Sequence, residues 1–135
     1  KSDGPDNCIS MDDDPDAIAA KTMQAYSDPL RRHRHEPGHP TPDACNVFRL
    51  HTFVTDAARR EQLADRCRRA EIGCTDCKRA LADSIASIVE PFRQRKRAIR
   101  DADVADALAL GRDKARESAQ RTLADVRRAI GLMTV

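Results

Sequence analysis

Four of the five cysteines lie between residues 45 and 77, and their thiols are the groups in this chain best suited to unusual chemistry. They follow the pattern Cys-x21-Cys-x6-Cys-x2-Cys, at Cys45, Cys67, Cys74 and Cys77. A Cys-x2-Cys turn presents two sulfurs to the same point, so thiols at this spacing can converge on one metal centre. Four cysteine ligands suit an iron–sulfur cubane or tetrahedral zinc, and free or disulfide-paired thiols are the remaining alternative.

The fifth cysteine, Cys8, lies outside this cluster and makes the cysteine count odd. The sequence shows no secretory signal pattern and no apolar run near eighteen residues. Metal ligation or buried thiols are therefore favoured over a disulfide framework. We expect a cytoplasmic protein that does not enter the membrane.

The composition favours helices. Hydrophobic residues make up 40% of the 135 residues, many of them Ala, whereas aromatic residues make up only 3%. Such a core suits packed helices better than a β-sandwich. Residues 1–28 carry a net charge of −5 and the remainder +7. The basic part is compatible with an anionic partner such as RNA, although solvated basic helix faces are also common.

The sequence predicts five helical segments that would hold the cysteines and pack a core. Asp14 and Pro15 read as an N-cap and first residue of a helix to about residue 26. Further helices are expected over 45–54, over 56–70, from Cys74 with a late kink at Pro91, and from about Asp103 to Gly131. The residues expected to face inward are Ile18, Thr22, Ala25, Tyr26, Val47, Phe48, Leu50, Phe53, Val54, Ala57, Leu63, Cys67, Cys77, Leu81, Ile85, Ile88 and Phe92.

Residues 28–44 are expected to be irregular, because four prolines exclude a regular helix there. Residues 31–35 form a basic cluster within this segment, Arg-Arg-His-Arg-His, which is either a solvated loop or a phosphate contact. The same two interpretations stand for a second basic run after Pro91, which contains Arg93, Arg95, Lys96 and Arg97.

Several short segments, taken in order, carry a family resemblance. They are Lys1-Ser2-Asp3, Asn7-Cys8-Ile9-Ser10, Asp13-Asp14-Pro15, Pro37-Gly38, Cys45-Asn46-Val47-Phe48, Gly73, Glu90-Pro91-Phe92-Arg93, Lys114-Ala115-Arg116, Thr122-Leu123-Ala124-Asp125-Val126 and Ile130-Gly131-Leu132. In this order they resemble the C-terminal part of bacterial-type tryptophanyl-tRNA synthetases, beginning at the end of the class I Lys-Met-Ser-Lys-Ser loop. The resemblance covers essentially the whole chain.

This resemblance implies an all-α helical bundle, the anticodon-binding domain, preceded by a loop remnant of a Rossmann-like catalytic domain. Residues 1–14 would be the remnant and residues 15–135 the helical region. The full-length enzyme of this family is a homodimeric ligase that activates tryptophan with ATP and transfers it to tRNA(Trp). By resemblance, Lys1 and Ser2 belong to the signature loop, where the lysine meets the ATP phosphates. The piece alone is expected to be inactive.

A subset of this family carries a similar four-cysteine pattern and binds a [4Fe-4S] cluster beside the anticodon-binding region. By resemblance, Cys45, Cys67, Cys74 and Cys77 would be its ligands, with a first gap about one residue shorter than in that pattern. Lys78 and Arg79, beside the cysteine turn, are the candidates for RNA contacts. The competing hypothesis is a stand-alone helical four-cysteine module, holding zinc or an iron–sulfur cluster, that binds RNA or protein without catalysis.

Overall fold

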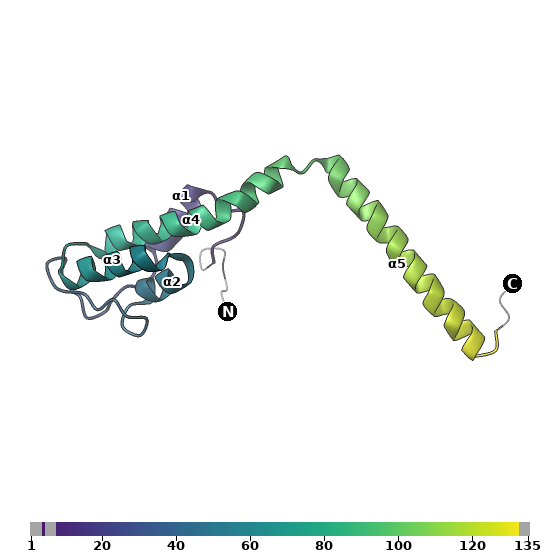
Figure 1. Cartoon of the computed structure of the whole chain (residues 1–135), viewed down its shortest axis with the longest axis horizontal. Helices are drawn as coiled ribbons and strands as arrows, with labels where there is room; N and C mark the ends of the chain where they lie inside the picture. Colours follow the sequence, from purple (N-terminus) through teal and green to yellow (C-terminus); the bar gives the residue numbers. More distant parts are fainter. Residues whose placement is uncertain (1–3, 5–7, 133–135) are drawn as a thin grey trace. The chain divides into compact units, whose positions relative to one another are not determined.

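A computed structural model describes residue 4 and residues 8–132, and it contains five helices and no strand within that part of the chain. The expected all-α fold is confirmed. The chain divides into two compact units, Lys1–Gln94 and Arg95–Val135. In the first unit, α1, α2 and α3 gather around the N-terminal part of α4 (Figure 1).

Helix α1 (Pro15–Met23) forms one side of the core. Its predicted N-cap is confirmed, since the Asp14 carboxylate accepts a hydrogen bond from the Ala17 N–H at 2.7 Å. Ile18 is buried against Ala82 and Val89 of α4. The helix ends three residues earlier than expected, and the prediction that Tyr26 faces inward is wrong because its side chain is exposed.

Helices α2 (Asn46–Val54) and α3 (Ala57–Arg68) form a helical hairpin. Helix α2 buries Val47 and His51, whereas Leu50 and Phe53, expected to face inward, are exposed. Its buried face is therefore rotated from the one that the apolar residues indicated. Helix α3 is capped by Asp56, one of the two residues, with Thr55, expected to cap it, and it buries Leu63 and Ala64. Ala57, at its start, is exposed rather than inward.

Helix α4 (Cys74–Ala98) carries the longest buried face, which includes Leu81, Ala82, Ser84 and Val89. Ile88 and Phe92, expected on that face, are exposed, because the buried stripe follows residues 81, 82, 85 and 89 instead. The helix continues through Pro91. In the turn before α4, Ala70 rather than Gly73 takes the left-handed conformation, with φ of 58°.

Helix α5 (Asp101–Ala129) makes up most of the second unit and buries none of its residues. It starts two residues before Asp103, whose carboxylate accepts the Arg100 backbone N–H at 2.9 Å. Gly131 follows its end with a φ of 73°, in agreement with the prediction. Among the described residues no helix combines the length and apolar character needed to cross a membrane.

Candidate metal centre

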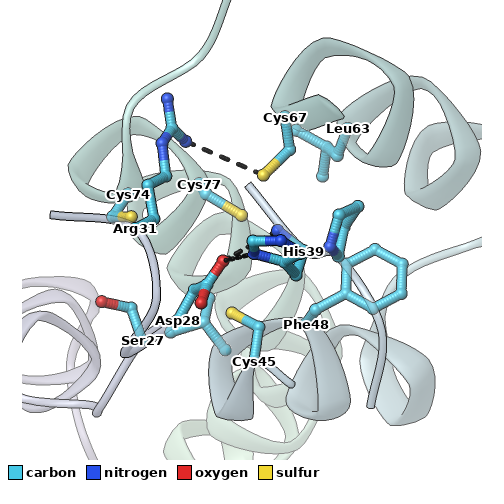
Figure 2. Close-up of a pocket in the computed structure, with 12 residues that line it drawn as sticks. Ser27, Asp28, Arg31, His39, Cys45, Phe48, Leu63, Cys67, Cys74 and Cys77 are labelled. Atoms are coloured by element: carbon cyan, nitrogen blue, oxygen red, sulfur yellow. Dashed lines mark hydrogen bonds and ion pairs between the residues drawn. The ribbon is translucent and has the colours of Figure 1, made fainter. Parts of the chain in front are cut away.

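Cys45, Cys67, Cys74 and Cys77 line one pocket, so the structure brings the four predicted ligands together. Cys45 is the N-cap of α2, Cys67 lies in the last turn of α3, and Cys74 is the first residue of α4. The sulfurs of Cys45, Cys67 and Cys77 point toward the middle of the pocket, and Cys74 lies at its edge near Arg31 (Figure 2). The ends of three helices thus meet at the four thiols.

The pocket is small and walled mainly by apolar side chains. Its apolar lining comes from Pro40, Val47, Phe48 and Leu63, and its polar lining from Ser27, Asp28, Arg31 and His39. It encloses about 20 Å³, close to the space of one water molecule. No disulfide joins the four cysteines. Among the described residues, no group of three or more His, Cys, Asp or Glu side chains is arranged to hold a metal ion. The four thiols thus line one pocket without an arrangement that identifies a particular metal.

Gly38 connects the irregular segment 28–44 to Cys67 at the pocket. Its N–H donates to the Cys67 carbonyl oxygen at 3.0 Å. A Cβ at this position would stand 2.5 Å from the Cys67 sulfur and 3.3 Å from Arg31 Cδ. Such a contact is far inside van der Waals range, so a residue without a side chain is required here.

Arg31 supplies a buried positive charge at the pocket wall. Its Nη1 donates to the Ile72 carbonyl at 2.9 Å and lies 3.8 Å from the Cys67 sulfur, and Nη2 donates to the Arg34 carbonyl. The remaining Nε–H is buried without a hydrogen-bond partner among the described residues. A buried donor of this kind costs free energy unless an acceptor is supplied, which suits an anionic centre in the pocket.

His51 lies behind Cys77 and was missed from the sequence. It is fully buried; its Nε2 lies 3.5 Å from the Cys77 sulfur and its Nδ1 lies 2.7 Å from Thr55 Oγ. Burial lowers the pKa of this imidazole, which is therefore neutral near pH 7. A signal was present: Val47, His51 and Thr55 stand four residues apart and so share one helix face.

Two of the four thiols, Cys67 and Cys77, are hard to ionise in this setting because their pKa values are raised. Burial, together with a smaller effect of the neighbouring cysteines, raises the pKa of Cys77 to about 12. Burial also raises the pKa of Cys67, against the opposing effect of the Arg31 charge. A bound metal reverses this balance, because a coordinated thiol gives up its proton.

Asp28 and His39 form a second polar pair at the pocket (Figure 2). Asp28 accepts from the His39 N–H at 2.8 Å, from the Leu30 N–H at 2.9 Å, and lies 3.0 Å from His39 Nδ1. Burial acts to raise the pKa of Asp28, but these hydrogen bonds outweigh it and hold the pKa below its usual range. The pair fixes the first part of the irregular segment.

A basic groove adjoins the cysteine pocket and shares Ser27, Arg31 and Cys74 with it. Its volume is about 490 Å³. Around it Arg34 and Arg79 lie 3.7 Å and 3.1 Å from the Asp76 carboxylate; both arginine side chains are largely exposed and Asp76 is half-buried. The groove is lined by Ser27, Arg31, Arg32, His33, Arg34, Gly73, Cys74, Thr75, Asp76 and Arg79.

The two predicted RNA contacts fall in different surroundings. Arg79 lines the basic groove, whereas the Lys78 ammonium donates to the Met23 carbonyl at 2.9 Å and holds the end of α1. Arg68 and Arg69, which flank the cysteines in sequence, pair instead with Asp65 and Glu71. The charge at the pocket comes from Arg31, which is far from the cysteines in sequence.

The predicted signature-loop residues, Lys1 and Ser2, lie outside the described residues. Their role stays a prediction, as does the division of the chain at residue 14.

The chain is similar in sequence to several tryptophan–tRNA ligases. No protein-family model matches the chain. It is 31% identical over 129 residues to the tryptophan–tRNA ligase of Aquifex aeolicus, covering 93% of this chain and 32% of that protein. The tryptophan–tRNA ligase of Ralstonia nicotianae is 35% identical over 132 residues, with 93% and 32% covered. That of Thermotoga maritima is 32% identical over 131 residues, with 94% and 39% covered.

These matches span nearly all of this chain but only about a third of the length of each relative. The resemblance found in the sequence is thus supported by similarity along nearly all of the chain. The chain is similar, over more than nine tenths of its residues, to a stretch making up about a third of bacterial tryptophan–tRNA ligases.

Proposed function

We propose that this chain is the C-terminal, tRNA-binding portion of a tryptophan–tRNA ligase, and that its four cysteines hold a [4Fe-4S] cluster. The similarity along the chain supports the first part. The observation that carries the second is the convergence of all four cysteines on one pocket beside a buried arginine with an unpartnered N–H. Joined to a catalytic domain, the chain would serve ATP-dependent charging of tRNA(Trp).

Cys45, Cys67, Cys74 and Cys77 would be the cluster ligands. The cluster would chiefly crosslink the ends of α2, α3 and α4, which stabilises a core with few aromatic side chains. Arg31 would offset the negative charge of the thiolates, and its free Nε–H would find an acceptor there. Zinc is the alternative occupant, because four thiolates also suit a tetrahedral ion with zinc–sulfur bonds of about 2.3 Å.

The basic groove would contact single-stranded RNA of the anticodon arm. Arg34 and Arg79 can pair with phosphates or stack under bases, and His33 adds a ring on which a base can stack. Because Cys74 belongs to both pockets, loading of the cluster would shape the groove from one side. The metal site and the RNA site are therefore expected to be coupled in stability.

The metal is identified by anaerobic reconstitution of the chain with iron and sulfide. We expect about four irons and four sulfides per chain, which is the cubane stoichiometry, and loss of binding when any of the four cysteines is replaced by serine. Cys8→Ser is the matched control and should load normally, because Cys8 lies outside the pocket. Stoichiometric zinc without iron would overturn the cluster.

RNA binding is measured separately with tRNA(Trp) and with the same tRNA carrying an altered anticodon. We expect preference for the native anticodon and no aminoacylation by these 135 residues alone. Equal affinity for both transcripts contradicts the anticodon assignment. Aminoacylation of tRNA by the isolated chain contradicts the proposal that catalysis requires a separate catalytic domain. Binding of a protein partner but no tRNA supports the stand-alone module instead.

A further inference from the structure

Helix α5 carries an apolar stripe that repeats every eleven residues. The stripe runs from the first turn of the helix to its C-cap, at intervals of 4, 7, 4, 7 and 4 residues: Val104, Leu108, Ala115, Ala119, Val126 and Ile130. An eleven-residue repeat corresponds to about 3.67 residues per turn, close to the 3.6 of an α-helix. The six residues therefore stay on one face along the whole length of α5.

The stripe is uncovered in the structure. Its four larger side chains, of Val104, Leu108, Val126 and Ile130, are between 47% and 69% exposed, and its two alanines are exposed as well. Helix α5 buries none of its residues although it is 29 residues long. Helices in proteins gain most of their stability from packing an apolar face, so this stripe indicates a surface that takes a partner.

The stripe is complementary to itself. Its intervals are the same when they are read from either end, and so is the order of side-chain sizes, with larger residues at both ends and alanines in the middle. A second copy aligned antiparallel about the middle of the stripe gives three kinds of facing pair: Val104 with Ile130, Leu108 with Val126, and Ala115 with Ala119. A two-fold interface needs this reciprocity, because each pair must occur twice.

The charges of α5 favour the antiparallel direction. Residues 101–110 contain three aspartates and no basic residue, whereas residues 111–129 contain six basic and three acidic residues. In an antiparallel pair the acidic half of each helix lies beside the basic half of the other, and the two helix dipoles oppose each other. A parallel pair would instead place the two acidic halves side by side, which is unfavourable.

We propose that this stripe is a self-association surface, occupied by the α5 helix of a second copy of the chain in antiparallel orientation. The reciprocal order of the stripe favours a second copy over an unrelated partner. One helix pair offers a modest contact area, so we expect a weak dimer. In the monomer, present at low concentration, α5 keeps only its local interactions. The proposal depends neither on the metal nor on RNA.

The first test uses the wild-type 135-residue chain, free of metal and under reducing conditions, so that no disulfide can join two copies. Sedimentation equilibrium from about 1 µM to about 1 mM covers the dissociation constants of weak complexes. Direction is measured by methyl nuclear Overhauser effects. Val104 and Ile130 of one chain lie about 39 Å apart along the helix, so contact between their methyl groups can arise only between copies. We expect a monomer–dimer equilibrium and this contact.

The second test places a charge in the stripe. Leu108→Glu should weaken the dimer by about 10-fold or more, because an unpaired carboxylate would be buried. Leu110→Glu is the matched control: Leu110 is 58% exposed on the same helix, but it lies two residues along and so on the opposite side. Its dimer should match that of the wild type.

A double variant tests the direction independently. Leu108→Glu with Val126→Lys should regain most of the lost affinity, because in an antiparallel pair the two new charges face each other between copies. Within one chain these positions are about 27 Å apart, so they cannot pair there. In a parallel pair the new carboxylates would face each other, and affinity would not recover.

A chain that stays monomeric at about 1 mM, or a dimer that survives Leu108→Glu unchanged, overturns the proposal. So does a monomer in which the stripe methyls contact another part of the chain, or bind only a separate domain added to it. Circular dichroism shows whether each variant keeps its helices. If Leu108→Glu loses them, the wild-type mass and the contact between Val104 and Ile130 decide.

Discussion

Gly38 lies against Cys67 so closely that the two residues make one structural unit, although 28 residues of chain separate them. The Gly38 N–H binds the Cys67 carbonyl at 3.0 Å, and a methyl group on Gly38 would stand 2.5 Å from the Cys67 sulfur. The direction of that sulfur is thus set by a glycine in an irregular segment as well as by its own helix.

Gly38→Ala should destabilise the fold by about 1–3 kcal/mol, the usual cost of overpacking, and should lower iron uptake because the Cys67 sulfur must turn away. Chemical unfolding and iron content measure the two effects. Gly111→Ala is the control: beyond the neighbouring backbone of its own helix, no described atom lies within 4 Å of the added methyl, and in a helix interior the change is favourable. Wild-type iron uptake in Gly38→Ala would show that the contact does not set the sulfur's direction.

Arg31→Met should lower the free energy of unfolding by about 1–3 kcal/mol, because the Ile72 and Arg34 carbonyls lose a charged donor in a buried place. It should also shorten the cluster lifetime by removing the adjacent positive charge. Arg32→Met, next along the chain, is exposed and should stay within about 0.5 kcal/mol of wild type in unfolding. Equal stability of the two variants contradicts the structural role of Arg31.

Asp28 should make the protein acid-sensitive. Its folded pKa lies below the unfolded value of about 3.9, so its contribution is fully present above about pH 4 and is lost as the pH falls through the folded pKa. Asp28→Asn should cost about 1–3 kcal/mol at pH 7 and much less at pH 3. Urea unfolding of both proteins at the two pH values tests this, and an equal difference at both would count against it.

Arg34→Ala and Arg79→Ala should each weaken tRNA binding and reduce the salt dependence of log K by about 0.7 per lost phosphate contact on a single strand. Fluorescence titration at several salt concentrations measures this slope. Arg128→Ala on α5, where Arg128 pairs with Asp125, is the control and should leave the slope unchanged. Lys78→Met should instead lower the stability of the fold, because its ammonium holds the end of α1.

Features governed by local sequence were predictable. Asp14 and Asp56 cap helices because a short carboxylate before a helix satisfies free N–H groups next to it. The starts of the helices at residues 46 and 74 also followed from sequence, within a residue or two. The four cysteines were recognisable as a set because their residue type is rare and their spacing short.

Features governed by tertiary contacts could not be predicted from the sequence. Arg31 reaches a cysteine 36 residues away, and His51 reaches one 26 residues away, so no local pattern places either residue beside the cysteines. The inward faces of α2 and α4 were misplaced for a related reason. In α2 the larger apolar residues Leu50 and Phe53 are exposed, while a histidine with hydrogen-bond partners takes the buried position. Apolar periodicity cannot find a buried face that is partly polar.

Helix α5 buries no residue, and this has a consequence for its motions. Its order depends on local terms, namely the Arg100–Asp103 cap and neighbouring ion pairs such as Arg121–Glu117, each contributing only about 0.2–0.5 kcal/mol. Opening a turn of this helix exposes almost no new apolar surface, so the free energy of opening stays small. Its amide hydrogens should therefore exchange with solvent much faster than those around the buried Leu81 of α4. Amide exchange should accordingly give different free energies of opening for the two units of the chain.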